Sequence, residues 1–217
     1  MYQIFGTGQF LRIILYVNAF FAVALGSSLG GLISVPYMQA ISLSVLLVTT
    51  ALTILGETPV FPWICRLPLV WHWLPDLDGD YDIQIQSNWP IVSGRANDSD
   101  TPTKELLFAK QGTVRITARL LSIRMTLNTA DGYSSSNVVV AAVSRERDEP
   151  GPVLSYVFKS KVPIPESTDS SEHFGAARIE IPKTRKISTL SGSYWTNRNW
   201  HNGLNTAGII KLIRHPS

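Results

Sequence analysis

The nine residues from Leu190 to Arg198 (LSGSYWTNR) carry the side chains of this chain that are best suited to ligand binding. Alternate residues of a β-strand share a face, so Gly192, Tyr194, Thr196 and Arg198 would point the same way, with the glycine where a ligand could approach the backbone. A ring on which a base can stack and a guanidinium that can hold a phosphate are groups that bind nucleotides. A buried Tyr beside a solvent-facing Thr and Arg would give the same pattern, so these residues alone leave both interpretations open.

Motifs for catalysis or metal binding do not accompany this stretch. The sequence contains no G-x-x-x-x-G-K-[ST] phosphate loop and no H-E-x-x-H zinc motif, and its four His and single Cys lack zinc-site spacing. The segment 76–82 resembles half of a calcium loop, but Tyr81 and Ser87 occupy the positions of the required Gly and Glu. We interpret 76–82 as a solvated turn and expect no bound metal or cofactor, and the sequence motifs give no support for an enzyme.

A long charge-free stretch dominates the N-terminal third. Residues 13–56 contain no Asp, Glu, Lys, Arg or His, and about 20 apolar helical residues cross a bilayer. We predict two transmembrane helices, about 10–33 and 37–61, joined by a tight loop at Ser34-Val35-Pro36, where the proline disfavours helix. A buried helix pair in a soluble domain and a cleaved signal peptide over the first span are the alternatives.

The few charges beside this hairpin predict its orientation. Arg12 lies at the outer end of the first span and Arg66 lies just beyond the second, whereas the turn between the spans carries no charge. Positively charged flanks stay in the cytoplasm. We therefore expect a multi-pass membrane protein with both termini and the domain after the hairpin in the cytoplasm.

The composition changes after the hairpin. All but two of the 19 Lys and Arg residues, and all but one of the 16 Asp and Glu residues, lie after Pro75. We divide the chain into residues 1–75, a transmembrane hairpin with a Pro- and Trp-rich interfacial connector, and residues 76–217, one compact domain. The nearly balanced charge of this domain does not favour duplex nucleic acid as a partner.

The domain 76–217 shows the periodicity of strands. Alternation of apolar and polar residues, with turn signals between runs, predicts about eight short strands and an all-β barrel. Within 113–127 the set of alternate positions that carry apolar residues shifts by one, which we interpret as a β-bulge or a sharp bend in an otherwise continuous strand. Asp131-Gly132 predicts a hairpin turn. The segment 138–143 is apolar on both faces, so one face is expected to meet the helices or another subunit. The acidic, Ser- and Pro-containing segment 163–171 predicts a mobile loop.

Four short motifs and the hairpin before them resemble a known family. In order, the motifs are Gly112-Thr113-Val114-Arg115-Ile116, Phe174-Gly175-Ala176-Ala177, Leu190-x-Gly192-x-Tyr194-x-Thr196-Asn197-Arg198 and Gly208-Ile209-Ile210-Lys211-Leu212. Together they resemble the two-transmembrane β-barrel effectors of bacterial cyclic-oligonucleotide antiphage signalling systems (CBASS). The resemblance covers the whole chain.

The resemblance implies a mechanism. A cGAS-like nucleotidyltransferase makes a cyclic dinucleotide on infection, and the cytoplasmic β-barrel binds this messenger. The protein then forms a homo-oligomer in the inner membrane, and its transmembrane helices disrupt the lipid bilayer, so that the infected cell dies before the phage spreads. The chain would be a receptor and effector without catalytic residues, and its ligand would be the cyclic dinucleotide.

Eight residues are candidates for the ligand site. Tyr194, Thr196, Asn197 and Arg198 match the strand motif of the family. The chemistry of their side chains alone adds Trp89, Arg119, Arg124 and Tyr156, which could stack on bases or hold phosphates. Two other functions remain open: a membrane-tethered, lipocalin-like barrel that binds an apolar ligand, and a structural membrane adaptor.

Overall fold

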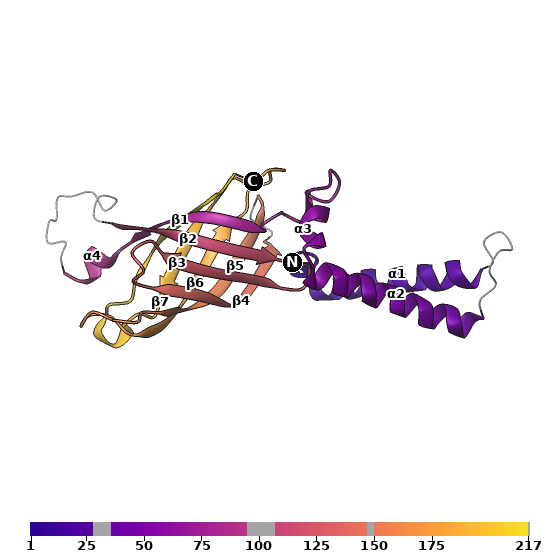
Figure 1. Ribbon diagram of the computed structural model, residues 1–217, viewed down its shortest axis with the longest axis horizontal. Helices are drawn as coiled ribbons and strands as arrows, with labels where there is room; N and C mark the ends of the chain where they lie inside the picture. Colours follow the sequence, from indigo (N-terminus) through magenta and orange to yellow (C-terminus); the bar gives the residue numbers. More distant parts are fainter. Residues whose placement is uncertain (28–35, 95–106, 147–149, 217) are drawn as a thin grey trace.

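The computed structural model describes residues 1–27, 36–94, 107–146 and 150–216. In these residues the chain forms a helical hairpin that extends from one end of a closed antiparallel β-barrel (Figure 1). The barrel has eight strands that pair in sequence order, and β1 pairs with β8 to close it. The prediction of a two-helix hairpin followed by an all-β barrel of about eight strands is therefore confirmed.

Two helices of the described chain are long and apolar enough to cross a membrane. They are α1 (Thr7–Gly26) and α2 (Tyr37–Glu57), and they lie side by side (Figure 1). Most of their large apolar side chains are exposed, among them Leu15, Phe20 and Leu46. The predicted loop at Ser34-Val35 lies outside the described residues. The second predicted span is too long, because Pro59 ends α2 and a separate short helix, α3 (Val60–Cys65), follows.

Inward and outward side chains alternate along the strands, except in the fourth strand, where the register shifts between Val138 and Val140 and the consecutive Val139 and Val140 are both exposed. Their bounds are β1 (Gly79–Ser87), β2 (Phe108–Ala118), β3 (Ile123–Thr129), β4 (Ser135–Arg145), β5 (Pro152–Lys161), β6 (Glu172–Glu180), β7 (Thr189–Thr196) and β8 (Ala207–Arg214). Three short helices complete the described chain: η1 (Tyr2–Phe5), α4 (Trp89–Val92) and η2 (Trp200–Asn202). The Asp131-Gly132 hairpin turn is confirmed, with Gly132 at φ 67°.

The predicted continuous strand across 113–127, with a bulge or a sharp bend in it, is wrong, because the chain reverses direction there. β2 and β3 are separate strands that pair with each other, and residues 119–122 form the turn between them. Asp78 accepts hydrogen bonds from Ala118 N at 3.1 Å and from the Arg119 side chain at 2.7 Å. Leu120 N donates to Leu55 O of α2. Segments distant in sequence therefore stabilise a turn that contains neither Gly nor Pro.

The helix-facing half of the barrel is filled by a tightly packed core. Inward side chains such as Ile83, Ile116, Ile179 and Leu212 are at most 1 % exposed. Residues from the N-terminus and the connector, namely Met1, Ile4, Phe61, Cys65 and Leu77, belong to the same cluster. The barrel is therefore closed at the end that faces the helices.

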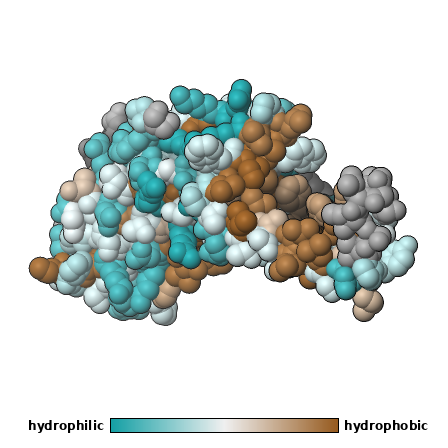
Figure 2. Space-filling model, turned by 45° about the vertical axis from the view of Figure 1, so that its right-hand side comes forward, coloured by the Kyte–Doolittle hydropathy of each residue, from teal (hydrophilic) through white to brown (hydrophobic). Residues whose placement is uncertain are grey.

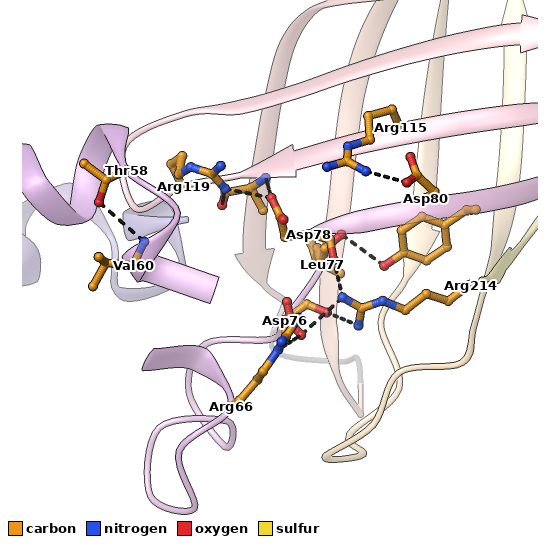
Figure 3. Close-up of polar contacts among 12 residues, drawn as sticks. Thr58, Val60, Arg66, Asp76, Leu77, Asp78, Asp80, Arg115, Arg119 and Arg214 are labelled. Atoms are coloured by element: carbon orange, nitrogen blue, oxygen red, sulfur yellow. Dashed lines mark hydrogen bonds and ion pairs between the residues drawn. The ribbon is translucent and has the colours of Figure 1, made fainter. Parts of the chain in front are cut away.

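Ion pairs connect the acidic segment 76–82 to other parts of the chain (Figure 3). Asp76 is buried and pairs with Arg66 of the connector at 2.8 Å and with Arg214 of β8 at 3.2 Å. Asp80 pairs with Arg115 on the neighbouring strand. The interpretation of this segment as a solvated turn is therefore wrong at Asp76, which ties the connector to the barrel.

Candidate functional site

The barrel half that faces away from the helices encloses a cavity of about 470 Å³. All eight strands contribute lining side chains, and the loops at this end, including α4, surround the mouth. This volume falls within the range of about 300–1,000 Å³ typical of small-molecule sites. The cavity therefore opens opposite the helical hairpin.

The floor of the cavity is apolar and aromatic. Val114, Met125 and Ile210 line it together with Tyr156 and Phe158, whose ring centroids are 6.0 Å apart. Burial raises the pKa of the Tyr156 phenol, so this hydroxyl stays protonated. Flat apolar ligand groups such as nucleobases can stack on such surfaces.

A cation, an aromatic ring and a carboxylate meet at the mouth of the cavity. The Arg198 guanidinium lies over the Trp89 ring, 4.5 Å from its centroid. Its Nε and a terminal nitrogen donate to the two oxygens of Asp169 at 2.5 and 2.6 Å. Asp169 comes from the β5–β6 loop, so the segment predicted to be mobile is tied to β7 by a bidentate ion pair.

A second cation, aromatic ring and carboxylate lie together at the mouth. The Lys110 ammonium is 4.5 Å from the Tyr133 ring centroid and 3.2 Å from Asp131. Hydrogen bonding from Thr129 and the charge of Lys110 lower the pKa of Asp131 to about 2, so its carboxylate is ionised at neutral pH. Tyr133 donates to Asp169 at 2.8 Å, which connects the two groups.

His173 of β6 adds a titratable group to the lining. Its Nδ1 is buried and has no hydrogen-bond partner within the described residues. Burial lowers the pKa of His173, Asp169 opposes this effect, and Arg198 adds to it. The imidazole is therefore mainly neutral at pH 7, and its Nδ1 is buried without a partner among the described residues.

The structure brings five of the eight candidate residues together. Tyr194, Thr196, Arg198, Trp89 and Tyr156 all line the cavity. Tyr194 and Thr196 are inward residues of β7, and Arg198 follows the end of this strand. The Thr196 hydroxyl already contacts Thr206 Oγ1 at 2.9 Å, so it holds the start of β8 as well as lining the cavity.

The other three candidates lie elsewhere. Asn197 accepts a hydrogen bond from Phe174 N at 2.7 Å, which fixes it to the β6 backbone outside the cavity. Arg119 pairs with Asp78 at the helix-facing end of the barrel, and Arg124 is exposed on the outer face of β3. The charge of these two arginines is consequently remote from the cavity.

Sequence reasoning missed several lining residues. Phe158 lies on the inward face of β5, two residues after Tyr156, and His173 lies on the inward face of β6. The two-residue period of these strands could have identified both. Tyr133, Asp131 and Asp169 come from loops, where no periodicity marks an inward position. Their arrangement depends on which loops meet at the mouth.

Gly192 has a different role from the one its motif suggested. A Cβ at this position would lie 2.0 Å from the Arg178 carbonyl oxygen and 2.7 Å from the Ile179 Cα of β6. The neighbouring strand, not a ligand, therefore approaches the Gly192 backbone.

Comparisons with known proteins agree with this geometry. Residues 73–214 match the family model described as "Cap15, cyclic dinucleotide receptor domain". The chain is also 30% identical over 179 residues to CD-NTase-associated protein 15 of Escherichia albertii, and the match covers 82% of each protein. The chain belongs to the Cap15 family of CBASS effectors, and its barrel is a cyclic dinucleotide receptor domain.

Proposed function

We propose that this protein is the membrane-anchored effector of an antiphage response, in which a cyclic dinucleotide binds in the barrel cavity and triggers disruption of the inner membrane. The proposed ligand-contacting residues are Tyr194, Thr196 and Arg198 from the strand motif, and Trp89 and Tyr156 from side-chain chemistry. Lys110 and Phe158 join them on geometry. Asn197, Arg119 and Arg124 lie outside the proposed site.

The pairing of Arg198 with Trp89 and of Lys110 with Tyr133 carries this proposal. A cyclic dinucleotide has two phosphates and two bases, so its site needs two cations beside stacking surfaces. The mouth supplies two cations, each next to an aromatic ring, above an apolar floor. Asp169 and Asp131 neutralise these cations before the ligand arrives.

Membrane anchoring follows from the two apolar helices. We infer that α1 and α2 span the inner membrane with both chain termini in the cytoplasm, because Arg12 and Arg66 flank the hairpin on the barrel side. In this orientation the cavity mouth faces away from the bilayer. A messenger made in the cytoplasm would reach it directly.

Assembly is proposed to use an apolar row on the outer barrel surface. The row crosses five strands in register, and its members are Val140, Val157, Ala176, Trp195 and Ala207. Val140 and Trp195 are more than half exposed. Tyr156 and Tyr194 precede Val157 and Trp195 but point into the cavity, so a ligand that shifts these strands would also reshape the row. A ligand changes assembly only if it binds the assembled protein and the unassembled protein with different affinities.

A thermal-shift panel of cyclic dinucleotides tests the binding step with the full chain in detergent. A ligand that binds only the folded state raises the melting temperature by mass action. We expect one cyclic dinucleotide to raise it, its linear form to have no effect, and Arg198→Ala to abolish the shift. Arg124→Ala, which removes the same charge outside the cavity, should keep it. No shift with any cyclic dinucleotide, or an unchanged shift in Arg198→Ala, would overturn the proposed site.

The apolar floor supports one alternative, a lipocalin-like barrel that binds an apolar ligand. The polar mouth argues against it, because an apolar ligand would make no use of the charges of Arg198 and Lys110. A long-chain fatty acid in the same panel separates the two functions. A shift with the fatty acid and with no cyclic dinucleotide would favour the alternative.

A further inference from the structure

The helix-facing end of the barrel has a surface of its own, remote from the cavity. The connector residues 66–75 and the β6–β7 loop, residues 182–188, lie against each other there and enclose a second cavity of about 580 Å³. Leu69, Trp71 and Trp73 line it from the connector, and Lys183 lines it from the loop. We call these two segments together the basal surface.

The basal surface lies directly at the ends of the membrane helices. Leu120 N in the β2–β3 turn donates to Leu55 O of α2, and a Cβ at Gly56 would come within 2.7 Å of Leu121. No linker therefore separates the barrel from the helix ends. If α2 leaves the bilayer near Glu57, the loops at this end of the barrel lie at the level of the lipid headgroups.

The connector is held rigidly on the barrel. Asp76 joins Arg66 of the connector to Arg214 of β8 (Figure 3). Arg145 of β4 donates to the His72 carbonyl oxygen at 2.6 Å, and its guanidinium lies 5.3 Å from the Trp73 ring centroid. The barrel therefore presents a defined face toward the helices.

Apolar side chains project from this face. Trp63, Leu69 and Trp73 are 75 %, 87 % and 57 % exposed. Figure 2 shows the apolar surface concentrated where the barrel joins the helices, whereas the barrel wall in this view is mostly hydrophilic. Trp residues favour the membrane–water interface, where the ring is half apolar and the N–H stays hydrated.

The β6–β7 loop adds cations to the same face. Lys183, Arg185 and Lys186 are exposed, and the loop 182–188 contains no Asp or Glu. None of these three side chains forms an ion pair within the described chain. Exposed cations beside interfacial Trp residues complement the negative surface of a bilayer that contains anionic phospholipid.

We propose that the basal surface docks on anionic phospholipid headgroups, with the connector Trp and Leu side chains at the interface and Lys183, Arg185 and Lys186 on the headgroup phosphates. This inference rests on the proposed membrane anchoring. Docking fixes the barrel against the bilayer and leaves the cavity mouth pointing into solution. In this arrangement the β6–β7 loop binds lipid, and this role is separate from messenger binding.

Headgroup quenching of a fluorophore on the loop tests docking with the full chain in vesicles. Thr184→Cys places the label in the loop, and His201→Cys places a control label at the cavity end, while Cys65 is only 1 % exposed and escapes labelling. The vesicles contain phosphatidylcholine alone or one third phosphatidylglycerol, with a headgroup nitroxide as quencher. We expect phosphatidylglycerol to increase quenching at Thr184→Cys only, and high salt to reverse the increase.

Charge variants make the test specific. Each Lys or Arg near an anionic surface contributes about fivefold to the docking equilibrium, so Lys183→Glu/Lys186→Glu should weaken docking by about 25-fold or more. Lys161→Glu/Lys211→Glu changes the net charge equally on the barrel wall and should dock normally. Lys183→Gln/Lys186→Gln repeats the test if the first variant does not fold.

Two results would overturn the docking proposal: equal quenching of the loop label in both vesicle types, or equal behaviour of the loop and wall variants. Flotation of the chain with phosphatidylcholine vesicles at alkaline pH tests anchoring separately. A chain that floats but shows no phosphatidylglycerol-dependent quenching is anchored and not docked. A chain that does not float lacks the proposed anchor.

Discussion

Arg198 and Asp169 form a bidentate ion pair at the mouth of the barrel cavity, with N–O distances of 2.5 and 2.6 Å. The Asp169 side chain is only 1 % exposed, and the Arg198 side chain is 19 % exposed. The pair joins the β5–β6 loop to the end of β7. A ligand phosphate that binds Arg198 must share this guanidinium with Asp169 or displace the carboxylate.

Asp169→Asn should therefore tighten messenger binding while it weakens the fold. Removing the carboxylate charge removes repulsion of the ligand phosphate, and we expect affinity to rise about tenfold. Breaking a buried ion pair should lower the free energy of unfolding by about 3 kcal/mol. Calorimetric titration and denaturant unfolding measure the two effects. Weaker binding in Asp169→Asn would show that the carboxylate positions Arg198 and does not compete with the ligand.

Trp89→Ala tests whether the ring at the mouth contributes to binding. Trp89 lies against Arg198 and lines the cavity, so its loss removes a stacking surface and frees the guanidinium. Stacking of one base on an aromatic ring is worth about 1–3 kcal/mol, which predicts affinity about tenfold to a hundredfold weaker. Trp200→Ala is the matched control, because Trp200 is 68 % exposed at the same end and does not line the cavity. Equal affinities of the two variants would exclude Trp89 from the site.

His173 should make the stability of the barrel depend on pH. Burial lowers its pKa below the ordinary value of 6.5, opposed by Asp169 and assisted by Arg198. Stability from the neutral imidazole is therefore fully present above pH 6.5 and is lost as the pH falls toward the folded-state pKa. We expect the free energy of unfolding to decline over this window less steeply in His173→Gln than in the natural protein. Parallel pH profiles would contradict a buried, neutral His173.

Strand periodicity predicted the part of the site that lies on β7. The two-residue period requires no tertiary information, so it placed Tyr194, Thr196 and Arg198 on one face, and the structure shows that this face is the inward one. The same logic extends to Phe158, which is two residues after Tyr156 on β5. The barrel itself followed from the number of short strands and the absence of further helical patterns.

Contacts between distant segments could not be predicted in the same way. The reversal at 119–122 depends on Asp78 and on the Leu55 carbonyl, so the local sequence resembles a bulged strand. Arg119 and Arg124 have the same chemistry as Arg198, and only their places in the fold show that neither lines the cavity. Asp169 reaches Arg198 because the loops meet at the mouth, which periodicity does not describe.

Gly192→Ala separates a structural glycine from a ligand-contacting one. Its Cβ would overlap the Arg178 carbonyl oxygen of the neighbouring strand, and backbone atoms cannot move aside as a side chain can. We expect the free energy of unfolding to fall by about 2–3 kcal/mol, with or without ligand. Ser193→Ala, on the outward face of the same strand, should be nearly neutral. A Gly192→Ala protein of normal stability that loses only ligand affinity would restore the ligand interpretation.

Trp195→Glu tests the proposed link between the cavity and assembly. Trp195 is 52 % exposed in the apolar row, and Tyr194 beside it points into the cavity. A Trp at the centre of an interface typically contributes about 2 kcal/mol or more, so ligand-induced assembly should weaken about thirtyfold or more. The ligand-induced thermal shift should persist, because the substituted side chain points outward.

Light scattering of the full chain in detergent, with and without cyclic dinucleotide, measures this assembly. Thr126→Glu is the control, because it adds the same charge at an exposed position on β3, outside the apolar row. We expect it to assemble like the natural protein. If Trp195→Glu also assembles normally on adding ligand, the apolar row is not the subunit interface. If Trp195→Glu loses the thermal shift as well, Trp195 supports the cavity and its effect on assembly is indirect.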